Sequence, residues 1–519
     1  MTGNTGIIVA FVVYMALMLG IGVLCYKKSN SLSDYLLGGR GLNSWVAAMS
    51  AQASDMSGWL LMGLPGAVYA FGTGQIWIAV GLGIGTVLNW SIVASRLRRY
   101  TIKAGDSLTL PEYFENRFRD KSRVLRMASA VFIIIFFTVY SASAFVSGGK
   151  LFSTVFGIDY QVALLIGVLI ILAYTFLGGF LAVCWTDFVQ GLLMLVAILA
   201  VPILACMAVG GVSEVGEALN GVSPTFLDPL KETNGQNTSF ISIISQLAWA
   251  LGYFGMPHIL VRFMAIKDQR SVKKSRIIAI VWVIISLTCA VFVGIIGRAF
   301  VTGLYDPANG VADQESIFIR TIQKLFIEPG AFVPVAIIGG LFLCGILAAI
   351  MSTADSQLLV TASSLSSDIY KVAIDKKASD KKLLWVSRIA VLAVAVVAYF
   401  IARDPKSSIM DLVSNAWSGF GSTFGPLVLF SLFWKKTTRN GALAGMIGGG
   451  LTVIVWDYIP MMPGADGLVN LGVGTGLYSI IPGFLISSLL IVVFSLVGKG
   501  PSQDMVEEFQ EVALNKGDS

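Results

Sequence analysis

Apolar segments long enough to cross a lipid bilayer recur along the whole chain, and no other sequence feature constrains the fold as strongly. A helix needs about 20 residues to span roughly 30 Å of hydrocarbon, where every backbone polar group requires an internal partner. Two segments, 42–71 and 330–362, are longer than a bilayer needs, and we expect them to tilt or break. The pattern predicts an all-α polytopic membrane protein with about 13 transmembrane helices, at residues 5–26, 42–71, 74–95, 125–155, 160–178, 183–211, 238–261, 276–302, 330–362, 384–402, 408–433, 440–458 and 476–498.

The composition agrees with a single transmembrane transporter domain over residues 1–519. Hydrophobic residues make up 56% of the chain and charged residues only 13%, which is unusual for a soluble domain of this length. The five cysteines fall in or beside apolar segments without a CxxC spacing, which argues against disulfides and zinc. No P-loop, nucleophile triad or dinucleotide motif is visible, so we expect neither an enzyme, nor ATP-driven transport, nor an organic cofactor.

The distribution of lysine and arginine predicts the orientation in the cell membrane. With the N-terminus outside and the C-terminus cytoplasmic, 29 of the 36 basic residues fall in cytoplasmic loops and the tail, as the positive-inside rule requires. The formal charge of +6 then reflects loops that face anionic lipid, and it requires no nucleic-acid partner.

Polar residues interrupt one of the apolar segments and glycine and proline interrupt another, and the two interruptions lie five segments apart. The first is SAQASDMSG at 50–58 and the second is LAWALGYFGMPHI at 247–259. Many secondary transporters are built from inverted repeats whose broken helices meet at the substrate. We therefore predict the following organisation: an extra N-terminal helix at 5–26, a first repeat at 42–211, an inverted second repeat at 238–433, two peripheral helices at 440–498 and a cytoplasmic tail at 499–519.

The first interruption suits a small hard cation. An unwound turn survives in hydrocarbon only where it is buried in protein or lines a cavity, and its free carbonyls are oxygen ligands. The ninth segment, CGILAAIMSTADSQLL, carries the adjacent hydroxyls of Ser352 and Thr353, which would complete such a site. Alternatively, these hydroxyls only bond back to carbonyls of their own helix.

Three carboxylates fall within apolar segments, where an ionised group is costly and usually has a partner. They are Asp55, Asp187 and Asp355. Asp355 and Ser356 would join Asp187 around a second cation or a proton. The alternatives are an interfacial charge at the start of a helix for Asp187, or a salt bridge to a cytoplasmic arginine or lysine.

Aromatic residues flank both interruptions. Trp249 and Tyr253 lie four residues apart, hence on one helical face, while Trp59 closes the first interruption and Tyr140 lies in the fourth segment. Such rings would wall a cavity for a small organic solute, although each one taken alone is typical of packing. The single histidine, His258, is expected to make a structural hydrogen bond.

Several longer motifs carry a family resemblance. They are YLLGGR at 35–40, SDMSGWLLMGLPGAVY at 54–69, LTLPEYF at 108–114, FLAVCWTD at 180–187, LGYFGMPHIL at 251–260, ILAAIMST at 346–353 and TRNGALAGMI at 438–447. On these motifs the chain resembles the bacterial sodium/solute symporter family, nearly along its whole length. The resemblance implies two inverted five-helix repeats and sodium-driven alternating access.

The resemblance also implies binding residues. The sodium site would comprise the carbonyls of Ala53, Met56 and Ala349 and the hydroxyls of Ser352 and Thr353, with Asp55 in support. A pocket for L-proline would comprise Trp59, Tyr140, Trp249, Tyr253 and Pro257. The carboxylate of Asp355 departs from the small uncharged residue of similar carriers. One sodium is the default, with Asp187, Asp355 and Ser356 as candidates for a second cation.

The expected function is therefore sodium-coupled import of L-proline by alternating access, with Na⁺ as the coupling ion. The protein would be embedded in the lipid bilayer. No obligate protein partner is evident. The nearest alternative changes the solute to another amino acid, a carboxylate vitamin or a sugar. A passive channel or a membrane sensor is the alternative from another class, although the short tail leaves no room for a signalling domain.

Overall fold

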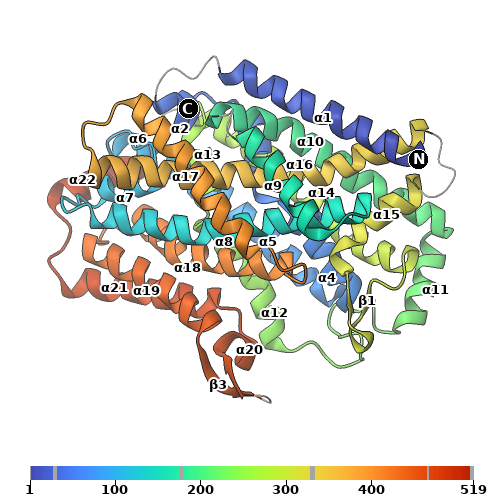
Figure 1. Ribbon diagram of the computed structural model, residues 1–519. Helices are drawn as coiled ribbons and strands as arrows, with labels where there is room; N and C mark the ends of the chain where they lie inside the picture. The colour runs from blue at the N-terminus through green and yellow to red at the C-terminus, as the bar shows by residue number, and fades with distance from the viewer. Residues whose placement is uncertain (1, 27–31, 176–178, 328–332, 465–466, 515–519) are drawn as a thin grey trace.

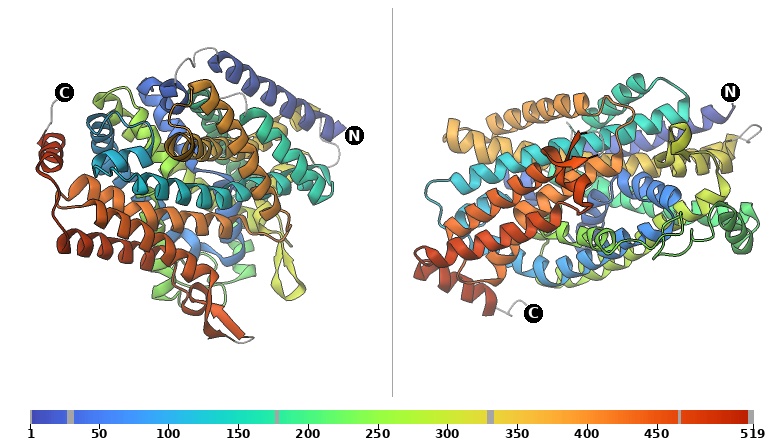
Figure 2. Two further views of the ribbon diagram at one scale, coloured as in Figure 1. Left: turned by 60° about the vertical axis from the view of Figure 1, so that its left-hand side comes forward. Right: turned by 90° about the horizontal axis from the view of Figure 1, so that it is seen from below.

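The computed structural model describes residues 2–26, 32–175, 179–327, 333–464 and 467–514, and most of them are helical. The helices form one elongated bundle (Figure 1). Helix α1 lies along one side of it and the pair α19 and α21 along the opposite side (Figure 2). Parts of three predicted segments, 176–178, 330–332 and 515–519, lie outside the described residues.

Within the described residues, ten helices are long and apolar enough to cross a membrane. Nine are α1 (Thr2–Tyr26), α8 (Val124–Phe156), α10 (Phe180–Val209), α14 (Gln269–Phe300), α16 (Val333–Ser363), α17 (Asp380–Ile401), α18 (Ile409–Phe433), α19 (Arg439–Tyr458) and α21 (Ile480–Val497). The tenth, Thr73–Lys103, combines a short turn at Thr73–Gln75, α5 (Ile76–Leu88), a π-helical turn at Asn89–Val93 and α6 (Ala94–Lys103). The chain is thus a multi-pass, predominantly helical membrane protein.

The seventh predicted segment is a pair of helices bent by 42°, and it is an eleventh candidate span if the pair is taken as one. It comprises α12 (Phe240–Leu247), a 3₁₀ turn at Ala248–Phe254 and α13 (Pro257–Ala265). Proline lacks a backbone N–H, so it suits the first turn of a helix and begins α13 after the bend. The glycines before it allow close packing on α18, because a Cβ at Gly252 would clash with Trp417 and one at Gly255 with the carbonyl of Phe420.

The remaining two predicted segments differ from simple spans. Segment 42–71 is divided into α3 (Ser44–Asp55) and a second half, which comprises a π-helical turn at Trp59–Gly63 and α4 (Leu64–Phe71). Segment 160–178 contains the short helix α9 (Tyr160–Thr175). Of the tilt or break expected for the other long segment, the break does not occur in the described part, because α16 runs without interruption from Val333 to Ser363 and continues as a π-helix through Ile374.

Short elements close the two ends of the bundle. Figure 1 places α11 (Val212–Val222), α15 (Ile317–Phe326) and the hairpin of β1 (Tyr305–Asp306) and β2 (Val311–Ala312) at one end. It places α7 (Leu110–Arg117) and α22 (Gln503–Leu514) at the other end. The remaining short elements are α2 (Leu32–Leu37), the turns Gly38–Arg40, Pro307–Asn309 and Gln314–Ser316, α20 (Leu471–Thr475), and the antiparallel hairpin of β3 (Pro460–Gly464) and β4 (Gly467–Asn470).

The core of the bundle lies around α3 and α16, whose side chains are buried on almost every face. Small residues allow the neighbouring helices to approach closely. A Cβ at Gly6 of α1 would clash with Ala336 of α16, and one at Gly191 of α10 would clash with Met49 of α3. The polar interruption of segment 42–71 therefore lies in the interior of the protein and has no contact with lipid.

Candidate functional site

The site begins at the break between α3 and the following π-helical turn. Helix α3 ends at Asp55, and Met56 leaves the helical region with φ −84° and ψ 67°. Helical structure resumes after Ser57, whose hydroxyl accepts a hydrogen bond from the Trp59 amide at 3.3 Å. A Cβ at Gly58 would clash with Ser147 of α8, so this neighbour requires glycine at the break. The break is fully enclosed by protein.

Three of the predicted sodium ligands meet at this break. The Ser352 hydroxyl of α16 donates to the carbonyl of Ala53 at 2.8 Å and to that of Ala349 at 3.3 Å. Thr353 is also fully buried, and its hydroxyl has no hydrogen-bond partner among the described residues. Neutral carbonyl and hydroxyl oxygens are the donors that a small hard cation prefers, so these residues fit Na⁺.

A short side-chain hydrogen bond joins the two interruptions. The Tyr253 hydroxyl, in the 3₁₀ turn, donates to Oδ2 of Asp55 at 2.6 Å. Oδ1 of Asp55 has no hydrogen-bond partner in the described part of the chain. On the other side of the break, the Trp59 indole donates to the Asp55 carbonyl at 3.1 Å. The carboxylate therefore links the break in α3 to the bend between α12 and α13.

The predicted aromatic residues gather at the same place. The rings of Trp59 and Trp249 have centroids 6.2 Å apart, and both residues are buried. Two further rings, which the sequence analysis missed, complete the group. Trp417 of α18 lies 6.1 Å from Trp249 and 5.1 Å from Tyr253, and Tyr478 lies 5.5 Å from Trp249. Neither ring adjoins a sequence interruption, so no local signal marked them.

Pro257 begins α13 after the bend, and the next residue, His258, contacts two rings of α8. The His258 ring packs edge-on against Tyr140 and Phe137, at 6.3 and 5.6 Å between centroids. The prediction that His258 makes a structural hydrogen bond is wrong. His258 is fully buried, and neither ring nitrogen has a hydrogen-bond partner in the described ranges.

Asp187 lies in a buried polar cluster next to the break. Its Oδ2 accepts a hydrogen bond from the Ser50 hydroxyl at 2.6 Å and another from the Ser54 hydroxyl at 3.0 Å. Helix α10 begins at Phe180, seven residues earlier, and Asp187 is fully buried. The interpretation of Asp187 as an interfacial charge at a helix start is therefore wrong.

Arg262 of α13 provides the positive charge of this cluster. Its Nη2 donates to Asp187 at 3.2 Å and to Ser356 at 2.6 Å, and its Nε donates to Ser50 at 3.1 Å. The guanidinium therefore contacts two of the three residues considered for a second cation. Asp355, the third, is also fully buried, with the Ser356 hydroxyl 3.4 Å from its Oδ1.

Arg262 is one of the 29 basic residues that the charge distribution places in cytoplasmic loops and the tail, and this placement is wrong because only 1% of the residue is exposed. Its position within the apolar stretch HILVRFMA was the available signal, since an arginine between buried apolar residues needs a charged partner.

Comparison with known proteins decides the family. The family model described as "Sodium:solute symporter family" matches residues 35–449. The chain is 47% identical to the sodium/proline symporter of Escherichia coli (strain K12), over 98% of this chain and 96% of the relative.

The chain belongs to the sodium:solute symporter family. Among the relatives of this symporter, the osmoregulated proline transporter OpuE of Bacillus subtilis (strain 168) is 45% identical over 96% of each chain. Solved structures agree on the fold. A Na⁺-coupled sialic acid symporter in a substrate-bound outward-open state matches with a TM-score of 0.76 at 19% identity, over 97% of this chain and 99% of that one. A nucleobase-cation-symport-1 transporter matches with a TM-score of 0.57 at 13% identity, over 93% and 99%.

Proposed function

We propose that this symporter imports L-proline together with Na⁺ by alternating access. The observation that carries the proposal is the Ser352 hydroxyl, which lies between carbonyls of two different helices at a buried break. Relatives named as sodium/proline symporters or proline transporters, 45% to 47% identical over nearly the full length, support proline as the solute. The activity is transport without catalysis, and it needs no cofactor besides the coupling ion.

The proposed sodium site uses Ala53, Met56, Ala349, Ser352 and Thr353, and Asp55 supports it through Tyr253. When bound, Na⁺ would tie the end of α3 to α16. By linkage, an ion that orders the break raises the affinity for a solute that requires the same ordered state.

The proposed proline pocket is formed by Trp59, Tyr140, Trp249, Tyr253 and Pro257. Its aromatic walls suit a small apolar ring, and it offers few side-chain hydrogen bonds, which disfavours a sugar. The clustered rings of Trp59, Trp249 and Tyr253 support this assignment.

We propose one sodium per proline. A second cation at Asp187, Asp355 and Ser356 is the competing hypothesis, but the Arg262 guanidinium already contacts Asp187 and Ser356. Sodium titration of uptake decides between them. A Hill coefficient near one in the wild type that is unchanged in Asp355→Ala supports a single ion, whereas a coefficient near two that falls in Asp355→Ala supports a second.

For the architecture, we propose 13 spans, with inverted repeats at 42–211 and 238–433, the N-terminus outside and the C-terminus cytoplasmic. The two interrupted segments occupy corresponding positions in the proposed repeats. Their contact through Asp55 and Tyr253 supports the arrangement.

The experiment is uptake of labelled L-proline into proteoliposomes, with and without an inward Na⁺ gradient. We expect concentrative uptake that requires the gradient in the wild type and collapses in Ser352→Ala/Thr353→Ala. Ser286→Ala is the matched control, because that hydroxyl bonds only back to Val283 within α14. Proline uptake that is independent of the Na⁺ gradient would indicate a channel. Absence of proline uptake, with Na⁺ enhancing binding of another solute, would overturn the substrate alone.

A further inference from the structure

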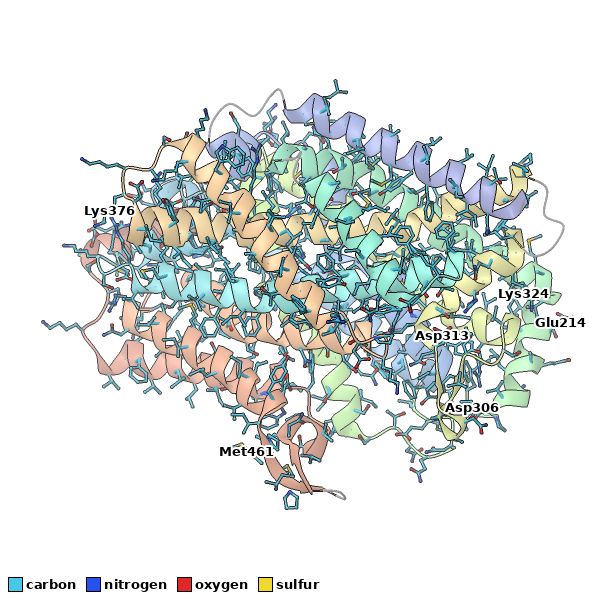
Figure 3. All side chains as sticks on the ribbon, in the orientation of Figure 1. Glu214, Asp306, Asp313, Lys324, Lys376 and Met461 are labelled. Atoms are coloured by element: carbon cyan, nitrogen blue, oxygen red, sulfur yellow. The ribbon has the colours of Figure 1, made fainter. Side chains whose placement is uncertain are left out.

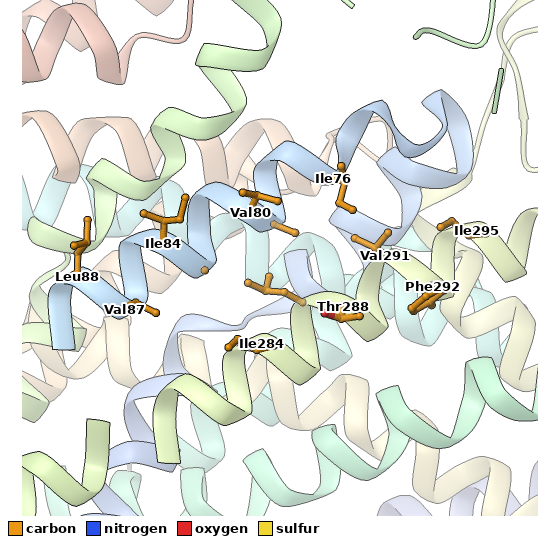
Figure 4. Close-up of a pocket in the computed structure, with 13 residues that line it drawn as sticks. Ile76, Val80, Ile84, Val87, Leu88, Ile284, Thr288, Val291, Phe292 and Ile295 are labelled. Atoms are coloured by element: carbon orange, nitrogen blue, oxygen red, sulfur yellow. The ribbon is translucent and has the colours of Figure 1, made fainter. Parts of the chain in front are cut away.

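An apolar groove separates α5 from α14 on the surface of the bundle (Figure 4). Its volume is about 540 Å³, and Thr288 contributes the single polar side chain among the 13 residues that line it. The rims are well exposed, at 49% for Ile84, 54% for Ile284 and 48% for Phe292. The groove therefore lacks the polar groups that a zwitterionic amino acid would need, and it is distinct from the site around Asp55.

The length of the groove matches one leaflet of a bilayer. Both walls belong to membrane-spanning helices. On α5 the lining runs from Ile76 to Leu88, which is about 18 Å at the helical rise of 1.5 Å per residue. Half of the hydrocarbon core is about 15 Å. Trp77 adjoins the outer end of the groove, where its indole donates to the Pro229 carbonyl at 3.0 Å, as expected for an aromatic residue at the membrane interface.

Close packing on other elements fixes the position of each wall. A Cβ at Gly81 or Gly85 of α5 would clash with the backbone of Leu247 or Ala250 in the bent segment. On the other wall, a Cβ at Gly294 of α14 would clash with the carbonyl of Pro65 in α4. Each helix is thus fixed to a different interrupted segment, and neither can move to close the groove without losing these contacts.

We propose that this groove binds one acyl chain of a bilayer phospholipid between α5 and α14. A helix from a second copy fits less well, because helix association in membranes favours seams of small residues, whereas the rims here are Val80, Ile84, Ile284 and Phe292. An acyl chain is thin, flexible and apolar, and the surrounding bilayer supplies it. By filling the space between the helices, it adds dispersion contacts that the walls otherwise lack.

Gly83 offers a direct test, because it lines the groove and a Cβ built on it meets no atom within 4 Å. Gly83→Phe adds a ring at this lining position, where the Cβ has open space, and replacing glycine within a helix improves helix propensity, so the fold is expected to persist. Gly20→Phe is the matched control, because Gly20 is an exposed glycine of α1 that likewise has no atom within 4 Å of an added Cβ. Gly83→Leu is a smaller second variant.

The full chain is reconstituted in vesicles of phosphatidylethanolamine and phosphatidylglycerol, extracted in detergent and analysed by native mass spectrometry. We expect the wild type and Gly20→Phe to retain one more phospholipid per chain than both Gly83 variants do. Added phospholipid should also raise the Tm of the wild type more than that of Gly83→Phe. Equal retention in all proteins overturns the proposal, and so does a change in oligomeric state on filling the groove with lipid retention unchanged.

Discussion

At the scale of single residues, the hydrogen bond between Tyr253 and Asp55 connects the two interrupted segments at 2.6 Å. Tyr253→Phe removes only the hydroxyl and leaves a buried carboxylate short of a donor, which costs about 1–3 kcal/mol. We expect a lower Tm and a several-fold higher Na⁺ concentration for half-maximal proline uptake. Tyr160→Phe is the control, since it removes a bond to the Ala402 carbonyl far from the break. An equal sodium response in both variants would contradict the proposed support of the ion site by Asp55.

The buried pair of Arg262 and Asp187 leads to a second prediction at this scale. Removing one member of such a pair leaves an uncompensated charge in the interior, at a cost of about 3–5 kcal/mol. Arg262→Met should therefore lower the Tm strongly. Arg262→Met combined with Asp187→Asn should recover part of the loss, because no full charge then remains at that pair. Additive losses in the double variant, measured by thermal unfolding in detergent, would show that the pair is not coupled.

At the scale of elements, α22 is fastened to the end of the bundle by charge and by burial. Arg119 pairs with Asp504 at 3.2 Å and with Glu508 at 2.5 Å, while Phe509 is buried beneath the Arg96 guanidinium. Ion pairs at an exposed surface contribute little singly, about 0–1 kcal/mol, and weaken with salt. The helix therefore depends on the combination of these contacts.

Arg119→Glu places like charges against both acidic partners and should release α22. Hydrogen–deuterium exchange of residues 503–514 should increase several-fold, whereas Lys121→Glu, an exposed change in the same loop, should leave it unchanged. Adding Asp504→Lys and Glu508→Lys to Arg119→Glu should restore protection. Protection that is unaffected by Arg119→Glu would show that burial of Phe509 is sufficient by itself.

At the scale of the whole molecule, the proposed orientation makes a direct prediction. Glu214 and Lys376 are exposed and lie at opposite ends of the bundle (Figure 3). In intact cells, a membrane-impermeant maleimide should label Glu214→Cys, and it should label Lys376→Cys only after lysis. The wild type measures the background from the five native cysteines. The reverse labelling pattern would overturn an outside N-terminus.

Predictions from local sequence patterns succeeded where packing in the interior of the molecule does not decide the outcome. Hydropathy and helix breakers are local properties, and they located most of the helices and both interruptions, at 50–58 and 247–259. Segment 330–362, for which a tilt or a break was expected, does not break in its described part, and several polar side chains of α16 bond to neighbouring elements. For example, Ser352 donates to the Ala53 carbonyl, and Ser356 accepts from Arg262. A polar run therefore unwinds a helix only where the surrounding packing favours it.

The sequence by itself determined that this chain is a membrane protein of the symporter type, with interrupted helices that carry its polar chemistry. These conclusions follow from apolar length, charge distribution and motifs, all of which are read along the chain. Only the tertiary structure decided that Arg262 pairs with Asp187, that Trp417 joins the aromatic group and that His258 packs against two rings of α8. Such pairings join residues tens to hundreds of positions apart, and their energy depends on distance and burial, which no local pattern encodes.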